Sequence, residues 1–429
     1  MNFPYPIENI RQHYINLSVF AFGFLSLLIS DGYALGPVLL LLASIYWLAQ
    51  RPRICLNGED LAILAVLVLY VVVAILFYFY HDEEMRQLDG SGRFVFAVLV
   101  LLFLLHNPFD ARYFWLGLAL GSIGVGLISI YLKSTLDLPR VYTSYIGSLQ
   151  LGNISMTFAM LSAAGIVWAA YQPRRVFWLV LMALAICLGM VSSFLAGTRG
   201  AWVGIPVLIP VLAWLYWRYL SPRFALLAIV LLSVLVAVMV LHPATGVRER
   251  FAVATQDMEQ LLTHGNPNTS IGRRLEMWRS GLMAFSEKPW LGWGEQGYKE
   301  FESAKIEEGR LHHSIAPHKS LHNQFIEEMA KRGLVGLAAF LLLMFVPLIL
   351  FLRKLSADDY RIRVFGAAGA VLMVSYTIFH LSLTFFYRNN ATVVFAFLLV
   401  CIWAAVRARE NELAANAVTE GDTSIVAAD

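Results

Sequence analysis

Long apolar runs recur along this 429-residue chain, and they constrain its fold more than any other feature. An α-helix needs about 17–25 apolar residues to cross a bilayer core of roughly 30 Å, and the runs have this length. Charged residues make up 14% of the chain, compared with about 25% in soluble globular domains. The sequence therefore predicts an all-α, polytopic integral membrane protein.

Twelve segments are predicted to cross the membrane. Some connections are brief, such as GTRG after the seventh segment and RNN after the eleventh, so the segments on either side are expected to form antiparallel hairpins. The predicted spans are 15–30, 33–49, 60–80, 93–106, 113–132, 150–171, 176–197, 201–217, 223–241, 333–352, 362–387 and 390–406.

Lysine and arginine are divided unevenly between alternate loops. Cytoplasmic loops carry an excess of these residues, so the arginine-rich set of loops is expected inside, together with both termini. The short outer loops carry few cations, which are Arg86, Arg93, Lys133, Arg140, Arg199 and Arg388.

The chain divides into four predicted parts. A polar loop as long as the one that follows the ninth span is more often functional than a mere connector, and this topology places it outside. The polar end of the chain, 410–429, is expected to be disordered. The parts are nine spans over 1–241, a large periplasmic loop over 242–332, three spans over 333–406 and a cytoplasmic tail over 407–429.

The long loop is expected to be helical in pieces. Ser270 can cap a helix on which Ile271, Leu275, Trp278 and Leu282 form an apolar stripe at helical spacing. A second piece, HNQFIEEMAKRG, is expected to run directly into the tenth span. The loop therefore predicts a helical cap on the outer face of the membrane.

Arg199 stands between two apolar segments, in the sequence TRGAW. Gly197 and Gly200 flank it and permit a tight turn with close backbone approach. A guanidinium at such a turn suits a phosphate group, which it can bind through two parallel hydrogen bonds. The spacing alone leaves open whether Arg199 binds an anionic ligand or lies among lipid head groups.

Other outer cations have simpler interpretations. Arg93 and Arg388 lie near span ends, where an arginine often extends to the lipid head groups. Arg273 and Arg279 can occupy the solvated face of the loop helix. The histidines of RLHHSIAPHKS have no carboxylate at helical ligand spacing, so they predict a polar loop and not a metal site.

Three motifs give the chain a family resemblance. TRGAW, GRRLEMWRSGLMAFSEKPWLGWG and HNQFIEEMAKRGLVGL follow one another in this order, and together they resemble O-antigen ligases. That superfamily also includes O-antigen polymerases and some protein O-oligosaccharyltransferases. The resemblance covers about 190–340 through its motifs and the rest of the chain through topology.

The resemblance implies a GT-C-like glycosyltransferase of the bacterial inner membrane with its active site at the periplasmic face. Such ligases transfer a glycan from undecaprenyl diphosphate to a sugar hydroxyl of lipid A–core, which completes lipopolysaccharide. The glycosyl diphosphate is already activated, so the family implies no cofactor, no metal and no ATP. The implied partners are the lipid-linked donor, the lipid A–core acceptor and membrane lipids, without nucleic acid.

Three residues match the functional positions of the family. Arg199 and Arg274 would bind the diphosphate and stabilise the charge that develops on it. His322 would be the general base that accepts the proton of the acceptor hydroxyl. Glu327 could orient a partner but receives no assigned role. Residues of second rank are Arg388, Arg93, Asn323 and Trp278.

Two relatives could use the same donor. O-antigen polymerases often have an arginine followed eleven residues later by glycine in an outer loop. No glycine has that offset from Arg140, Arg199, Arg248, Arg250, Arg273, Arg274, Arg279 or Arg310. This favours a ligase over a polymerase, and a protein O-oligosaccharyltransferase stays open.

A transporter of polyprenyl-linked glycans belongs to another class. Its substrate site would lie near the middle of the membrane, within broken or charged spans. Here the predicted spans are nearly free of charge, and the polar candidates gather at one face. That distribution favours chemistry at the membrane surface.

Overall fold

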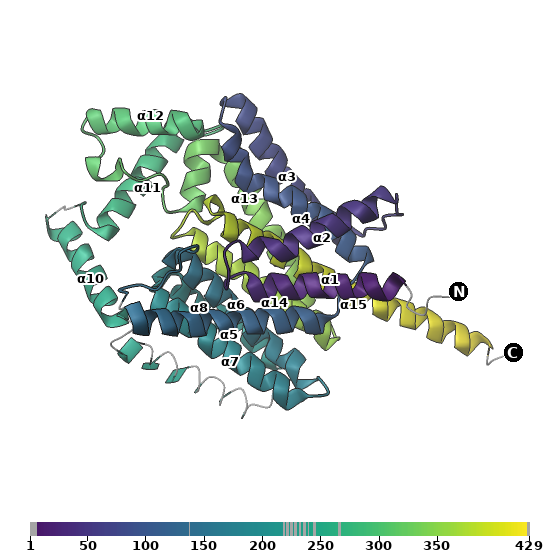
Figure 1. Ribbon diagram of the computed structural model, residues 1–429. Helices are drawn as coiled ribbons and strands as arrows, with labels where there is room; N and C mark the ends of the chain where they lie inside the picture. The colour runs from purple at the N-terminus through teal and green to yellow at the C-terminus, as the bar shows by residue number, and fades with distance from the viewer. Residues whose placement is uncertain are drawn as a thin grey trace.

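The computed structural model describes residues 7–136, 138–217, 246–264 and 267–426, together with scattered residues of 219–242. This described part is all-helical (Figure 1), as predicted. Its α-helices are α1 (Ile7–Leu25), α2 (Gly32–Ala49), α3 (Gly58–Tyr80), α4 (Leu88–His106), α5 (Ala111–Leu136), α6 (Ser148–Ala170), α7 (Arg175–Ala196), α8 (Arg199–Trp217), α10 (Val247–His264), α11 (Ser270–Glu287), α12 (Gly294–Glu307), α13 (Gln324–Lys354), α14 (Tyr360–His380) and α15 (Asn389–Val426).

Within the described residues, 10 helices are long and apolar enough to cross a membrane. They correspond to ten of the twelve predicted spans, with α4 extended at its start by the 3-10 turn Met85–Gln87. The predicted first span, 15–30, overlaps helix α1, which begins in polar sequence, ends at Leu25 and is not among the ten. The predicted ninth span, 223–241, lies largely outside the described residues.

The eleventh predicted span is too long at its end. Helix α14 ends at His380, and residues Phe385–Tyr387 form a separate 3-10 turn before α15 begins. The segment between α14 and α15 is therefore a loop with its own backbone path, and it contributes two residues to the cavity described below.

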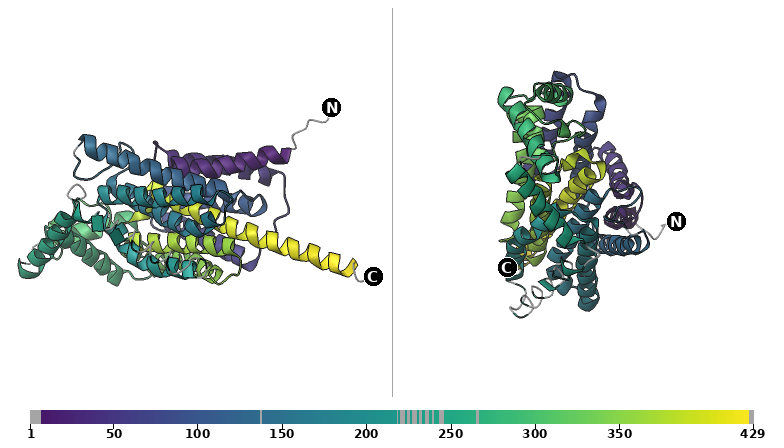
Figure 2. Two further views of the ribbon diagram at one scale, coloured as in Figure 1. Left: turned by 90° about the horizontal axis from the view of Figure 1, so that it is seen from below. Right: turned by 90° about the vertical axis from the view of Figure 1, so that its left-hand side faces the viewer.

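The spans form a bundle whose helices run along a common direction (Figure 2). Helices α10, α11 and α12 lie at one end of it, and the start of α1 and the end of α15 lie at the opposite end. Helices α6, α14 and α15 are the most enclosed of the candidate spans, with 83% or more of each span buried. Small residues allow this close packing; Gly189 on α7, for example, lies against Ser122 of α5.

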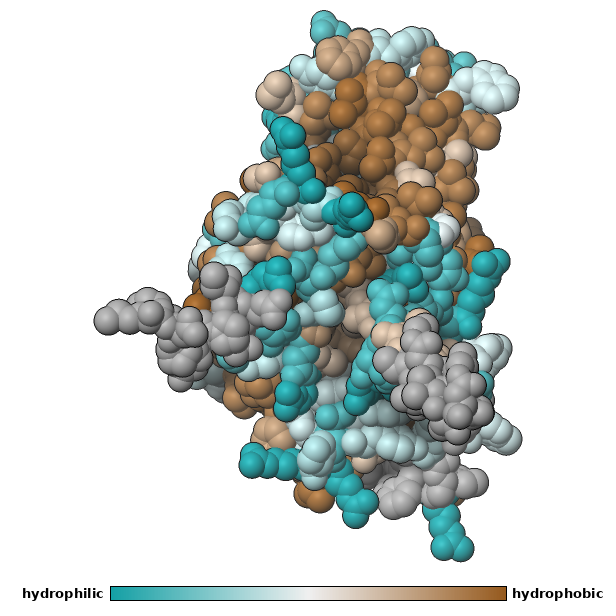
Figure 3. Space-filling model, turned by 90° about the vertical axis from the view of Figure 1, so that its right-hand side faces the viewer, coloured by the Kyte–Doolittle hydropathy of each residue, from teal (hydrophilic) through white to brown (hydrophobic). Residues whose placement is uncertain are grey.

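Helix α3 presents apolar side chains outward. Val72, Leu76 and Phe79 are 43%, 61% and 75% exposed, and Figure 3 shows a broad apolar surface at its top, at the level of α3 in Figure 1. Exposed apolar surface of this extent is expected where lipid replaces water as the solvent.

Helix α11 buries a different face from the predicted one. Its cap is Thr269, whose hydroxyl accepts a hydrogen bond from the Gly272 amide at 3.0 Å, and not Ser270. Leu275 and Leu282 of the predicted stripe are 40% and 47% exposed. Small residues fix the buried face instead, because a Cβ added at Gly281 would lie only 2.5 Å from a side-chain carbon of Ile326 on α13.

Helix α13 joins the loop to the bundle, as predicted. It begins after Asn323, is interrupted at Gly333 (φ 60°, ψ −154°) and continues as a span to Lys354. The left-handed φ favours glycine, and a Cβ there would also lie 2.7 Å from the Leu291 amide nitrogen. Gly333 thus separates a polar first segment of α13 from its membrane segment.

The end of the chain is helical as far as Val426, so the expectation of disorder over 410–429 is wrong for that part. Ion pairs one turn apart support the polar extension: Arg407 pairs with Glu410, and Arg409 with Glu412 at 2.8 Å. Helix α15 therefore continues without a break across the expected start of the tail at 407.

Candidate active site

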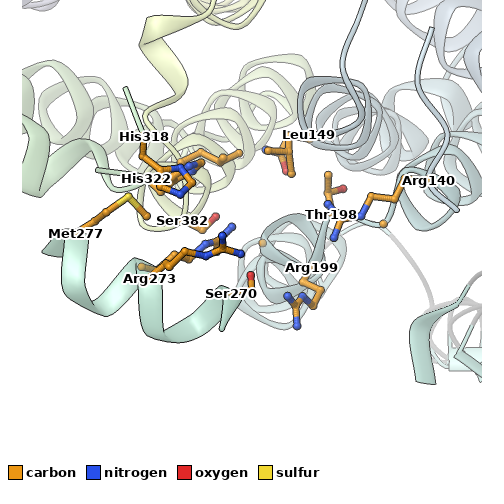
Figure 4. A pocket seen from close by; sticks show the side chains of 15 residues that line it. Arg140, Leu149, Thr198, Arg199, Ser270, Arg273, Met277, His318, His322 and Ser382 are labelled. Atoms are coloured by element: carbon orange, nitrogen blue, oxygen red, sulfur yellow. The ribbon is translucent and has the colours of Figure 1, made fainter. Parts of the chain in front are cut away.

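A polar cavity of about 250 Å³ lies where the bundle meets α11 and the loop before α13. It brings Arg199, Arg274 and His322 together, although they come from three separate sequence motifs. Figure 4 shows the histidines and Arg273 on one side of the cavity, with Arg140, Thr198 and Arg199 on the other. The lining residues are Arg140, Leu149, Asn153, Gly197, Thr198, Arg199, Gly200, Ser270, Arg273, Arg274, Met277, His318, His322, Ser382 and Leu383.

The TRGAW turn forms one wall. Gly197 ends α7 in the left-handed conformation (φ 66°), and its amide donates to the Phe194 carbonyl at 2.9 Å. Helix α8 begins immediately afterwards at Arg199. Gly200 faces Ser382 so closely that a Cβ would collide with the serine hydroxyl. The predicted tight turn is therefore confirmed, and it places a helix N-terminus beside Arg199, which favours a negatively charged ligand.

Helix α11 contributes two adjacent arginines. Burial lowers the pKa of Arg274 below its ordinary value, and the positive charges of Arg199 and Arg140 lower it further. Burial and Arg199 likewise lower the pKa of Arg140. Arginine remains protonated despite such shifts, so these groups repel one another until an anion enters. No carboxylate occurs among the described lining residues.

His322 lies at the edge of this positive cluster. Its backbone adopts a left-handed φ of 51°, and its Nδ1 is buried without a hydrogen-bond partner among the described residues. Its pKa is lowered to about 4, first by burial and then by the charges of Arg274, His318 and Arg388. The imidazole is therefore neutral near pH 7 and carries a lone pair that can accept a proton.

Trp278 and Asn323 lie beside the cavity without lining it. The indole Nε1 of Trp278 donates to the Leu321 carbonyl at 3.1 Å. The Asn323 side chain accepts from the amides of Phe325 and Ile326, which caps α13, and its Nδ2 donates to the Leu381 carbonyl at 3.3 Å. Both side chains fix the backbone on either side of His322.

Arg388 and Arg93 differ in their relation to the site. Arg388 is not among the lining residues, but it lies close enough to His322 to lower its pKa. The Arg93 guanidinium donates to the carbonyl of Asp89 on its own helix at 2.7 Å and lies near Tyr33. Arg93 is thus not brought together with the other predicted site residues.

Three cationic or titratable lining residues were missed as ligand candidates. Arg140 comes from the loop between α5 and α6, Arg273 from α11, and His318 from the loop before α13. His318 approaches His322 edge-on, with ring centroids 5.9 Å apart. The signal for Arg140 was present in the sequence, because it is one of few cations in the outer loops. Arg273 was assigned to a solvated helix face, and its contact with the bundle depends on tertiary packing.

The cavity combines two chemical capacities. Its arginines and the start of α8 can bind a doubly charged anionic group, and His322 beside them can accept a proton from a neutral hydroxyl. In the described part of the chain, no group of three His, Cys, Asp or Glu side chains is placed to hold a metal ion. The arrangement suits transfer to an alcohol from a substrate that has an anionic leaving group.

The sequence of the chain is similar to those of known proteins. The family model described as O-antigen ligase matches residues 191–341, which include the TRGAW turn, α11 and the first part of α13. An uncharacterized protein of Haemophilus influenzae is 25% identical over 389 residues, covering 90% of this chain and 97% of its own. The matched residues 191–341 supply most of the cavity wall, so the similarity to the O-antigen ligase family includes the cavity itself.

Proposed function

We propose that this protein is an O-antigen ligase of the bacterial inner membrane. It transfers a glycan from undecaprenyl diphosphate to a sugar hydroxyl of lipid A–core. The observation that carries the proposal is the meeting of Arg199, Arg274 and His322 in one cavity whose described lining contains several cations and no carboxylate. A diphosphate is the part of the donor that such a cavity would recognise.

The donor binds through its diphosphate. Arg199 and Arg274 hold the phosphate oxygens, and Arg140 and Arg273 add positive charge at the same cavity. Because the four guanidinium groups line one cavity, they can stabilise the additional charge that forms on the leaving group. A cavity of about 250 Å³ is smaller than the usual range of roughly 300–1,000 Å³ for small-molecule pockets, which fits a head group better than a whole glycan.

The transfer is a displacement at the anomeric carbon. The acceptor oxygen forms a bond to that carbon on the face opposite the phosphate, while the bond from carbon to phosphate oxygen breaks with its electron pair. His322 accepts the proton of the acceptor hydroxyl. Undecaprenyl diphosphate leaves with the negative charge, which the arginines hold, and the configuration at the anomeric carbon is inverted.

The placement of the cavity supports surface chemistry. It lies at the end of the bundle that carries α11 and the first segment of α13, opposite the end where α1 starts and α15 finishes. With both termini in the cytoplasm, the cavity faces the periplasm, and the isoprenoid tail of the donor stays in the membrane. A transporter would instead need its charged site near the middle of the spans.

One reconstitution tests the proposal. The purified chain is incubated with undecaprenyl-diphosphate glycan and lipid A–core, with chelator and without ATP, and the products are separated by size and lipid. Glycan attached to lipid A–core is the expected product. If the only product is a longer glycan on undecaprenyl diphosphate, the protein is a polymerase. If the donor crosses the vesicle membrane without any glycan transfer, the protein is a transporter.

A further inference from the structure

The backbone of Leu321 is held at both its amide and its carbonyl. The Glu327 carboxylate accepts a hydrogen bond from the Leu321 amide at 2.7 Å, and the Trp278 indole donates to the Leu321 carbonyl at 3.1 Å. Glu327 comes from α13 and Trp278 from α11. Leu321 directly precedes His322, so the two side chains together fix where the chain enters that residue.

Glu327 is itself firmly anchored. It is 6% exposed and forms an ion pair with Lys331 one turn further along α13. Lys331 also pairs with Glu295 of α12 at 2.6 Å, and the Glu295 amide donates to Glu83 in the loop between α3 and α4 at 2.8 Å. The carboxylate that holds Leu321 is thus connected to a loop helix and to the bundle.

The same carboxylate oxygen also accepts a hydrogen bond from a second loop at the cavity. The Thr384 hydroxyl donates to Glu327 Oε2 at 3.1 Å, and the neighbouring residues Ser382 and Leu383 line the cavity. Glu327 therefore ties the turn that carries His322 to the loop between α14 and α15, although it does not line the cavity itself.

His322 depends on such support for its orientation. A non-glycine residue in the left-handed region costs on the order of 1–3 kcal/mol and persists only where the surroundings impose it, and His322 has a φ of 51°. Its buried Nδ1 has no hydrogen-bond partner among the described residues. The ring is therefore oriented through its backbone, and in the preceding residue, Leu321, both the amide and the carbonyl are held by side chains.

We infer that Glu327 is a positioning residue for His322, acting through the Leu321 amide, with Trp278 as its counterpart on the carbonyl side. This inference rests on the proposed role of His322 as the base. It excludes direct contact between Glu327 and substrate, because the carboxylate is already occupied by Leu321, Thr384 and Lys331.

The chain offers a matched control. Glu328 is the next residue on α13, is 3% exposed and pairs with Arg332 one turn further along, at 3.4 Å. Its other partners are Tyr70 and Gln324, both at 3.0 Å. Glu328 thus repeats the burial and the ion pair of Glu327, and its partners lie outside the turn that carries His322.

The test compares Glu327→Gln, Trp278→Phe and Glu328→Gln in the reconstituted transfer reaction, with kcat and the donor KM measured separately. The wild-type chain must first transfer glycan, so a failure of the proposed function is seen before any variant is compared. Glu327→Gln should lower kcat about 10- to 100-fold, the usual effect of losing a supporting partner, with the donor KM changed by less than about threefold because the arginines remain.

Trp278→Phe keeps most of the packing and removes only the indole donor, so it should lower kcat in the same sense. Glu328→Gln should leave kcat within about threefold of wild type. If Glu327→Gln does not fold, the inference is tested by comparing the kcat of Trp278→Phe with the kcat of Glu328→Gln. The inference is overturned if the variants at 327 and 278 keep wild-type kcat, or if Glu328→Gln loses as much kcat as they do.

Discussion

Arg274 of α11 and Arg199 at the start of α8 line the same cavity, and the charge of Arg199 helps to lower the pKa of Arg274. The two residues belong to different sequence motifs, and their like charges repel each other. A pair of mutually repelling arginines that persists in one cavity is accounted for by a ligand with more than one negative charge, as in a diphosphate.

Removing either arginine should weaken transfer strongly. Arg199→Ala or Arg274→Ala is expected to lower kcat/KM for the donor by about 10²–10³-fold, the scale of losing one group that stabilises developing charge. Lysine at either position should restore only part of the activity, because it cannot bind phosphate through two parallel bonds. The measurement is steady-state kinetics in detergent with defined donor and acceptor.

Arg279→Ala is the control for these variants. Arg279 lies on the same helix as Arg274, is exposed and pairs with Glu276 at 3.4 Å, and it does not line the cavity. It should retain activity within about twofold, since an exposed ion pair contributes roughly 0–1 kcal/mol. Equal losses for Arg279→Ala and Arg274→Ala would contradict a specific role for Arg274.

Arg140 should contribute to donor binding. It lines the cavity, whereas Arg93, another cation of the outer loops, does not. Arg140→Ala is expected to raise the donor KM about 3- to 10-fold, somewhat less than the usual loss of a charged hydrogen bond because Arg140 is partly exposed. Arg93→Ala should leave the donor KM unchanged. Titration of each variant with undecaprenyl diphosphate measures its affinity for the diphosphate without turnover. A larger loss of affinity for Arg93→Ala than for Arg140→Ala would contradict a role of Arg140 in donor binding.

The pH dependence should report His322. A base must be neutral, so activity is lost as pH falls through its pKa, which is about 4 in the free protein because burial, Arg274, His318 and Arg388 lower it. A bound diphosphate offsets the arginine charges, so the pKa of His322 rises in the complex. The acid limb of kcat should therefore lie at higher pH than the acid limb of kcat/KM for the donor. Coincident limbs, or a rate that increases as pH falls, would contradict this order.

Gly333 should be sensitive to substitution. Its φ of 60° disfavours any side chain, and a Cβ would also meet the backbone of Trp290 and Leu291. Gly309 has a φ of 70° with nothing within 4 Å of an added Cβ, so it isolates the cost of the backbone conformation. Gly309→Ala is expected to lose about 1–2 kcal/mol of stability, and Gly333→Ala more. Thermal unfolding of both variants measures the difference; equal losses would show that the contact at Gly333 is tolerated.

The membrane spans and the turn at Arg199 could be predicted because they depend on residues that are close together in the sequence. Apolar runs identified ten spans, and the glycines around Arg199 predicted a tight turn, because bilayer thickness and backbone freedom act on neighbouring residues. The first predicted span is not among these ten, because α1 begins in polar sequence and ends at Leu25. The buried face of α11 was wrong because glycine and alanine, which carry little hydrophobic signal, make the contact with α13.

The site was predictable to a lesser degree. The resemblance supplied Arg199, Arg274 and His322, and the structure places all three in one cavity. The contacts of Glu327 could not be read from helical spacing, because it reaches the His322 turn through the backbone amide of Leu321. Arg140 was visible as a rare outer cation, but its approach to Arg199 depends on how α5, α6 and α8 pack.

The most direct test of the account is single-turnover transfer by His322→Ala, with binding of undecaprenyl diphosphate measured on the same preparation. The account predicts that the variant binds undecaprenyl diphosphate as tightly as the wild-type chain, because the arginines remain. It also predicts that the wild-type chain forms ligated lipid A–core and that the variant forms none. Transfer by His322→Ala at a near wild-type rate would contradict the role of His322 as the base.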